Sequence, residues 1–169
     1  DYTFTYTIDM PAFTLAETTG SATVNCPADA KAAGVDGSKI TLPTVKDVCG
    51  NTVIPTLKSA PDAIACEGDM VYVYTYTDCA GNTADYTFTY TIKMPAFTLA
   101  ETTGAAIVNC PADAKAAGVD GTKITLPTVT DVCGNTVIPT LKSAPSTIAC
   151  EGDMVYVYNY KDCAGNEAD

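Results

Sequence analysis

The sequence predicts an all-β protein made of tandem, disulfide-stapled β-sandwich domains. Strict alternation of aromatic side chains with valine or threonine marks two strands, residues 71–77 and 86–92. The chain of 169 residues also repeats itself with an offset of 84, and residues 85–168 differ from residues 1–84 at 10 positions. Each copy carries four cysteines at the same places. A unit of this length suits one small domain, so we expect two copies rather than one large fold.

Residues 71–92 predict a β-hairpin around which the rest of the unit is organised. The large side chains on one face of its second strand are Tyr86, Phe88, Tyr90 and Ile92, and the other face carries threonine. Alternation with period two is typical of a strand with two unlike faces. Residues 78–82 (DCAGN) contain glycine and asparagine, which accept the positive φ that a tight reversal needs. We expect the aromatic face to form the core, with tyrosine hydroxyls at its rim.

Substitutions between the two copies identify the face of the hairpin that meets water. Thr75 and Thr77 become Asn159 and Lys161, whereas every aromatic residue of the hairpin that is present in both copies is unchanged. Polar exchanges of this kind cost little only on a solvated face. The threonine face is therefore expected to be exposed.

The repeat sets the expected domain boundaries. Residues 1–8 copy residues 85–92 and have no hairpin partner before them, so we expect them to be the final strand of a preceding repeat. Residues 9–92 form the first complete domain, and residues 93–169 form a second domain without its final strand. In the intact molecule we expect a neighbouring copy to supply that strand, either from the same continuous chain or by donation from another subunit.

The other elements of the unit are short. Residues 13–15 and 21–26 are expected as strands, and the alanine-rich residues 27–33 as a loop or a weak helical turn. Prolines interrupt the strands expected at 39–45 and 52–57, which places them at edges or bulges.

Turn signals separate these strands. Residues 47–51 (DVCGN) echo the hairpin turn in composition, and residues 59–62 lead into a short strand at 63–66. About seven short strands with a turn signal roughly every ten residues predict an immunoglobulin-like β-sandwich.

Composition excludes several classes of function. The net charge is −11 and the chain has no arginine or histidine, so it offers no basic surface for nucleic acid or for an anionic membrane. No apolar run approaches the ~20 residues of a membrane helix. Because no histidine is present and no base lies near Cys49 or Cys79 in the sequence, we expect no catalytic site and no enzyme activity.

Four cysteines per small β-domain indicate disulfides, and hence an oxidising, extracellular compartment. The absence of histidine and of any Cys-x-x-Cys pair argues against zinc. Four cysteines allow three pairings. A bridge between Cys66 and Cys79 is disfavoured, because a strand of about seven residues between them spans about 23 Å and the Cα atoms of a disulfide lie within ~7 Å.

Calcium is a candidate ligand. Asp47, Asn51, Glu67 and Asp69 offer the hard oxygen atoms that calcium prefers. Their spacing is not that of an EF-hand loop, and aspartate and asparagine are also ordinary turn formers. We expect no other cofactor.

Four motifs together resemble a known family of repeats. They are residues 25–29 (NCPAD), 43–51 (PTVKDVCGN), 66–69 (CEGD) and 74–83 (YTYTDCAGNT). They are similar to a hyalin-repeat (HYR-like) domain, and in particular to its four-cysteine version in large surface proteins of gliding and biofilm-forming Bacteroidetes, of which the SprB-type gliding adhesins are one class. The resemblance covers essentially the whole unit and implies an immunoglobulin-like fold, export to the cell surface and a role in adhesion.

The resemblance also bears on the disulfides. The usual hyalin repeat has a cysteine in its last strand where this chain has Tyr86, and Cys79 in the adjoining turn is the nearest substitute. The pairs that we expect are Cys26–Cys79 and Cys49–Cys66, repeated as Cys110–Cys163 and Cys133–Cys150.

We expect a mechanical function, in which these repeats space and stiffen a long secreted surface filament or stalk with an adhesive or gliding role. The partners would be neighbouring repeats of the same filament. The alternative is a module that binds a surface glycan or polymer weakly, with avidity from many copies. Near-identical copies favour the stalk, because a stalk needs the same module many times.

Overall fold

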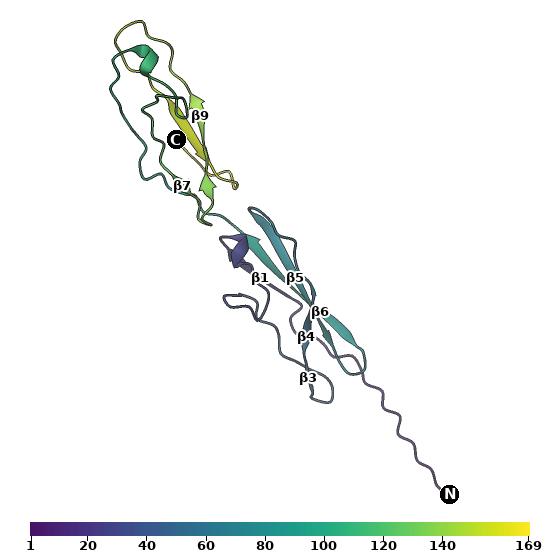
Figure 1. Ribbon diagram of the computed structural model, residues 1–169. Coiled ribbons are helices and arrows are strands. Elements are labelled where there is room, and N and C mark those ends of the chain that lie inside the picture. Colours follow the sequence, from purple (N-terminus) through teal and green to yellow (C-terminus); the bar gives the residue numbers. More distant parts are fainter. The chain divides into compact units, whose positions relative to one another are not determined.

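The computed structural model describes residues 1–169 and divides them into two compact units, Asp1–Lys93 and Met94–Asp169. The prediction of an all-β protein is confirmed, because the structure contains eleven strands and two three-residue 3-10 turns, η1 (Pro27–Asp29) and η2 (Pro111–Asp113) (Figure 1). No helix has the length and the apolar character to cross a membrane.

The predicted hairpin is the centre of the first unit. Strands β5 (Gly68–Thr77) and β6 (Thr83–Ile92) pair without interruption from Thr77 opposite Thr83 to Gly68 opposite Ile92. Both strands therefore extend beyond the alternating runs of the sequence. The tight reversal uses Gly81 at φ 86°, whereas no residue other than glycine has positive φ.

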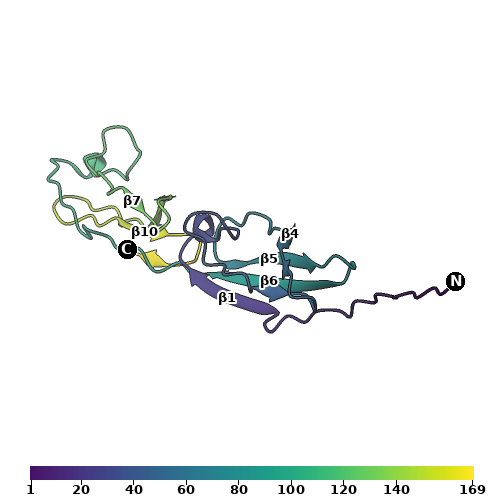
Figure 2. The ribbon, with the colours of Figure 1, turned by 90° about the horizontal axis from the view of Figure 1, so that it is seen from below.

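Two further strands flank the hairpin. Strand β1 (Thr19–Val24) pairs in parallel with β6, and β4 (Pro55–Ser59) pairs antiparallel with β5, which gives the order β1-β6-β5-β4 (Figure 2). Strand β6 is thus the only link between β1 and the rest of the sheet.

The aromatic face of this sheet is the core, as predicted. Tyr76 and Tyr90 are 0% exposed, and the other large residues of that face are also buried: Met70, Tyr72, Tyr74, Tyr86, Phe88 and Ile92. A two-stranded ladder, β2 (Val45–Lys46) with β3 (Thr52–Val53), and the extended chain before it pack on the face through Ala30, Ile40, Val45 and Val53. The core thus lies between a sheet and a layer that is mostly loop.

Tyrosine hydroxyls hold this loop layer on the sheet. Tyr72 Oη donates to the Ala30 carbonyl at 2.8 Å, and Tyr76 Oη donates to the Pro43 carbonyl at 2.7 Å. Tyr90 Oη accepts from the Lys39 amide at 2.8 Å. Residues 39–44, which we expected to form most of a strand, make no ladder, and residues 13–15 and 63–66 also form none. The side chains of the sheet replace a ladder for residues 39–44, because they satisfy part of the backbone there.

The second unit repeats this plan in a shorter form. Strands β7 (Val129–Thr130) and β8 (Thr136–Val137) form the small ladder. Strands β9 (Pro139–Ser143), β10 (Val157–Lys161) and β11 (Glu167–Ala168) form a sheet in the order β11-β10-β9.

The sheet of the second unit is shorter because the described residues of that unit, 94–169, do not include a copy of residues 86–92, the main part of β6. Residues 103–108, which correspond to β1, form no strand, and Ile107 is 96% exposed. The buried core of this unit consists of Val129, Val137 and Tyr160. A β1-like segment without its β6 partner has no ladder to join.

Residues 1–8 form no strand in this structure, although their sequence is that of residues 85–92. Tyr2, Phe4, Tyr6 and Ile8 are 62–89% exposed. None of the strands in residues 11–92 pairs with this segment. Its expected place as the last strand of another repeat stays a prediction.

Candidate functional site

Two turns with the same chemistry lie in each unit and carry half of the cysteines. In the first unit they are residues 47–51 (DVCGN) and 78–82 (DCAGN). Each begins with an aspartate whose backbone amide donates to the asparagine carbonyl four residues later, at 2.9 Å for Asp47 and 3.1 Å for Asp78. Glycine at the fourth position takes φ 86° in both turns, a conformation that other residues rarely adopt.

The aspartate carboxylate fills the inside of each turn. Asp47 Oδ1 accepts from the amides of Cys49 and Asn51, both at 2.9 Å, and Asp47 Oδ2 accepts from Asn51 Nδ2 at 2.9 Å. Asp78 accepts the same set from Ala80 and Asn82 at 2.8–2.9 Å. Both aspartates are 8% exposed. The turns are therefore closed by their own side chains.

This bonding favours the ionised carboxylates. The hydrogen bond from the Asn51 side chain, with backbone amides of the turn, lowers the pKa of Asp47 below its ordinary 3.8. The Asn82 side chain acts in the same way on the pKa of Asp78. In the second unit burial raises the pKa of Asp131, but the Asn135 side chain and the turn amides outweigh it, and the pKa is again lowered.

The structure does not assemble the candidate calcium ligands. Asp47 and Asn51 bond each other, while Asp69 lies on β5 opposite Thr91 and accepts from Thr91 Oγ1 at 2.8 Å. Pro55 lies close to Asp47 and Asn51 in sequence and is opposite Tyr76 on β5. Tyr76 is seven residues along this strand from Asp69, which corresponds to about 23 Å. Glu67 is exposed beside Asp69. No group of three His, Cys, Asp or Glu side chains is placed to hold a metal ion.

The cysteines show a different distribution of disulfides from the expected one. Cys26 and Cys66 are disulfide-bonded in the first unit, and Cys133 and Cys163 in the second. The free cysteines are all exposed: Cys49, Cys79, Cys110 and Cys150. Each pair that we expected (Cys26–Cys79, Cys49–Cys66, Cys110–Cys163 and Cys133–Cys150) joins a bonded cysteine to a free one, so none is formed here.

The register of the first unit explains why the expected pairs do not form. Cys26 follows Val24, which is opposite Ile92 at one end of the hairpin. Cys79 lies in the turn at the other end. Strand β5 has ten residues and spans about 30 Å, far more than the ~7 Å between the Cα atoms of a disulfide. The expected Cys26–Cys79 pair is therefore wrong, because the two cysteines lie at opposite ends of the sheet.

A methionine contacts the hairpin turn in each unit. Cys79 Sγ lies 3.5 Å from Met10 Sδ, and Asn82 Nδ2 donates to the Met10 carbonyl at 3.4 Å. The second unit repeats these contacts, with Asn166 Nδ2 donating to the Met94 carbonyl at 3.5 Å. The sequence shows Met-Pro at both places, but nothing in its pattern reveals that the methionine packs on the turn.

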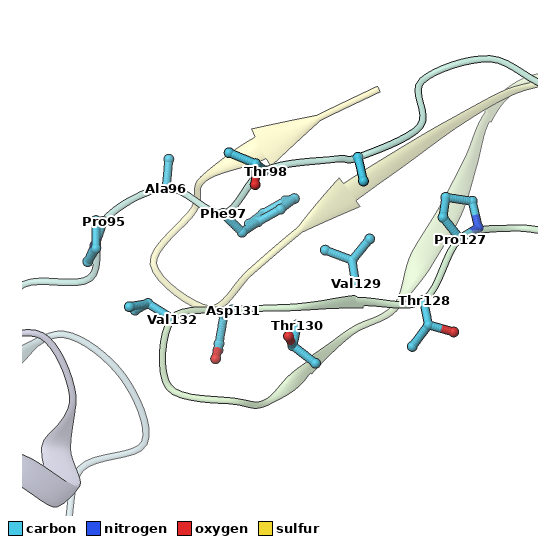
Figure 3. A pocket seen from close by; sticks show the side chains of 11 residues that line it. Pro95, Ala96, Phe97, Thr98, Pro127, Thr128, Val129, Thr130, Asp131 and Val132 are labelled. Carbon is cyan, nitrogen blue, oxygen red and sulfur yellow. The ribbon is translucent and has the colours of Figure 1, made fainter.

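A cavity of about 430 Å³ lies in the second unit. Figure 3 shows Phe97 and Val129 on its walls. The remaining lining residues are mainly small, apolar or hydroxyl-bearing: Pro95, Ala96, Thr98, Ala100, Pro127, Thr128, Thr130, Asp131 and Val132. Asp131 already accepts from Cys133 and Asn135. The counterpart of Phe97 in the first unit, Phe13, is buried in the core at 8% exposure.

Comparison with known proteins identifies two matching segments. A family model described as an HYR-like domain with 4 cysteines matches residues 14–92 and 98–169. Hyalin from Strongylocentrotus purpuratus is 32% identical over 134 residues, which is 76% of this chain and 11% of hyalin. The chain thus spans about a tenth of the length of that relative. No solved structure matches it.

Proposed function

The chain belongs to the family of HYR-like domains with four cysteines, and on that premise we propose that it is a pair of repeat modules from an extracellular adhesion protein. Similarity to hyalin over 76% of the chain supports this proposal, as do the disulfide-bonded cysteines, because disulfides persist in oxidising compartments. The matching family model describes an HYR-like domain and names no enzyme.

The role within that protein is mechanical. The observation that carries this proposal is that both units repeat several of the same internal bonds, although residues 1–84 and 85–168 differ at 10 positions. Tyr76 Oη and Tyr160 Oη donate to Pro43 and Pro127 at 2.7 and 2.8 Å, and all four DxxxN turns are closed in the same way. A spacer needs one module many times, whereas an enzyme needs only one site.

The parent protein is proposed to be a long secreted filament or stalk at the cell surface. The finer assignment, a gliding adhesin of the SprB-type class in Bacteroidetes, is the most specific form of this proposal and draws its support from the four-cysteine motifs alone. Neighbouring repeats of the same filament are the proposed partners. Antibodies against residues 1–169 should label intact, unpermeabilised source cells, and label that appears only after permeabilisation would contradict the assignment.

Force spectroscopy tests the mechanical role. The chain is held by its ends and stretched with and without a reductant. A disulfide keeps the residues that it encloses from extending, at ~3.6 Å per residue. We expect short extensions under oxidising conditions and longer extensions at lower force after reduction. If the oxidised chain extends smoothly, without discrete unfolding events, the spacer role is excluded.

The alternative is weak multivalent binding of a surface glycan or polymer. The cavity beside Phe97 is the observation in its favour, since an aromatic ring and threonine hydroxyls suit a sugar. In the first unit, which has β6, the corresponding Phe13 is packed in the core, and this favours the spacer. A glycan array probed with residues 1–169 separates the two: binding at millimolar concentrations that is lost in Phe97→Ala would favour the alternative.

A further inference from the structure

We propose that every unit forms two disulfides with one connectivity, first cysteine to third and second to fourth. The four bridges are Cys26–Cys66 and Cys49–Cys79, then Cys110–Cys150 and Cys133–Cys163. The four cysteines that are free in this structure then form the second disulfide of each unit. This inference does not depend on the proposed function.

The basis is that the two units show complementary halves of the pattern. In the first unit the bonded cysteines are the first and third, Cys26 and Cys66. In the second unit they are the second and fourth, Cys133 and Cys163. The offset of 84 makes Cys133 the counterpart of Cys49, and Cys163 the counterpart of Cys79. Because each copy has cysteines at all four positions, each copy can form the disulfide that the other shows.

The register brings the first and third cysteines to the same end of the sheet. Val24 and Gly68 are both opposite Ile92, so they lie on either side of β6, about 10 Å apart. Cys26 lies two residues after Val24, and Cys66 two residues before Gly68. Both segments leave the sheet there and are free to converge. A bridge between them joins β1 to β5 across the end of β6.

The second and fourth cysteines lie toward the opposite end of the sheet. Cys79 lies in the turn that follows Thr77, and Pro55 of β4 is opposite Tyr76 close to that turn. Val53 lies two residues before Pro55 and pairs with Val45 across the turn that contains Cys49. Both cysteine turns therefore lie beyond the same end of β5. In the second unit Pro139 is opposite Tyr160 in the same way, and there both cysteines are bonded.

The backbone around each free thiol matches that around its bonded counterpart. Cys110 has φ −133° and ψ 147°, and Cys26 has φ −130° and ψ 147°. Gly152, two residues after Cys150, has φ 151°, and Gly68 has φ 149°. Bonding therefore requires no different local fold at Cys110 or Cys150.

The same holds for the turn cysteines. The Cys49 and Cys133 amides each donate to the aspartate of their turn at 2.9 Å. Cys79 Sγ lies 3.5 Å from Met10 Sδ, and Cys163 Sγ lies 3.7 Å from Met94 Sδ. The backbone of Cys49 therefore has the same turn contact as that of Cys133, and the sulfur of Cys79 has the same methionine contact as that of Cys163.

The second unit has no counterpart of β6 to bring its first and third cysteines to one end of a sheet. There a hydrogen bond joins the two segments that carry these cysteines. Tyr156 Oη donates to the Ala114 carbonyl at 2.8 Å, as Tyr72 Oη does to Ala30. Ala114 is four residues after Cys110, and Tyr156 is six residues after Cys150. This hydrogen bond therefore joins the two segments a few residues from Cys110 and Cys150.

Each new bridge needs a two-electron oxidant, which we assign to the class of disulfides, such as glutathione disulfide or a disulfide oxidoreductase. The thiolate of one cysteine attacks a sulfur of that disulfide and expels one thiolate, which leaves a mixed disulfide on the protein. The thiolate of the second cysteine then attacks the protein sulfur and expels the other. Two protein thiols lose two protons and two electrons, and the oxidant becomes two thiols.

The test is a disulfide map of residues 1–169 refolded with reduced and oxidised glutathione, alkylated and digested at acidic pH. Cleavage after lysine separates all four cysteines of the second unit, and additional cleavage after glutamate divides Cys66 from Cys79 at Glu67. We expect no free thiol in the denatured monomer. The expected links join residues 47–58 to 68–93 and residues 124–142 to 162–167.

Single cysteine-to-serine substitutions test the proposed pairs one at a time. Cys79→Ser should leave one new free thiol in the monomer, and that thiol should be Cys49. Cys150→Ser should likewise expose Cys110, while Ser at both positions of a pair should expose none. The proposal is overturned if the thiol released in Cys79→Ser maps to Cys26 or Cys66. It is also overturned if four thiols per chain stay free after oxidation, or if Cys49 links separate chains.

Discussion

The Tyr86 hydroxyl lies directly over Gly20, so close that a Cβ atom on Gly20 would be 2.1 Å from it and 2.8 Å from a ring carbon of Phe88. Gly20 is on β1 and Tyr86 is on β6, and the pair lies where these parallel strands run side by side. The absence of a side chain at Gly20 lets two aromatic residues of β6 cover the backbone of β1. The counterpart, Gly104, has no atom within 4 Å of that position.

Gly20→Ala should therefore destabilise the first unit. The added methyl group forces Tyr86 and Phe88 to move within a packed core, which typically costs about 1–3 kcal/mol. Gly104→Ala is the matched control and should leave stability unchanged within about 0.5 kcal/mol. Urea unfolding of both variants of residues 1–169 makes the comparison. Equal effects at the two positions would show that β1 does not pack against β6 in solution.

Tyr76→Phe should destabilise the first unit by about 1–3 kcal/mol, because it leaves the Pro43 carbonyl without its donor in a poorly solvated place. Tyr160→Phe removes the matching bond to Pro127 and should have a similar effect on the second unit. Tyr6→Phe is the control, since Tyr6 is 82% exposed. Thermal unfolding followed by near-ultraviolet circular dichroism reports the loss. If Tyr76→Phe matches Tyr6→Phe, the hydroxyl does not fasten the loop.

Acid should weaken the protein below about pH 4. The pKa values of Asp47 and Asp78 are lowered in the folded state from the ordinary 3.8. Their contribution is therefore complete above the unfolded pKa, and it is lost as the pH falls through the lower folded values. Urea midpoints measured from pH 7 to pH 2 should stay level and then fall.

Substitution identifies the groups responsible for the acid effect. Asp78→Asn should lower the midpoint at pH 7, because a neutral amide is a weaker acceptor for the three turn donors. It should also reduce the fall in acid. Asp36→Asn, on an exposed loop, serves as the control. A fall in acid that is unchanged in Asp78→Asn and in Asp47→Asn would assign the effect to other carboxylates.

Reduction should lower the unfolding temperature more than any single core substitution. A native bridge in a small domain typically contributes about 2–5 kcal/mol, and the total stability of such a domain is of similar size. Thermal melts of residues 1–169 with and without a reductant measure the effect. Cys26→Ser together with Cys66→Ser should reproduce part of it without any reductant. Equal melting temperatures would mean that the aromatic core suffices alone.

Extending the chain with a copy of residues 86–92 should enlarge the sheet of the second unit. We expect residues 1–169, extended with the sequence of residues 86–92, to form a β6-like strand that recruits residues 103–108. Hydrogen exchange should then show protected amides in residues 103–108 and in Tyr156 and Tyr158. Gly104→Ala, neutral in the shorter chain, should become as costly as Gly20→Ala. An extension with serine in place of the aromatic residues is the control, and the same protection with both extensions would refute the register.

The features of the fold that the sequence predicted correctly are local ones. The hairpin of β5 and β6, its buried aromatic face and its glycine turn follow from alternation and turn chemistry, which act between near neighbours. The repeat itself is visible without any structure. These features need no knowledge of which distant segments meet.

Pairings between distant segments depended on the tertiary structure. The parallel pairing of β1 with β6 decides that Cys26 lies at the Ile92 end of the sheet, far from Cys79. The pairing of β4 with β5 places Asp69 far from Asp47. The tyrosine bonds decide that residues 39–44 stay a loop rather than a strand. Each of these features depends on long-range register, which alternation and spacing within single strands do not encode. The sequence by itself determined the strands, the turns and the buried face, and only the packing of the strands decided which cysteines and which carboxylates share an end of the sheet.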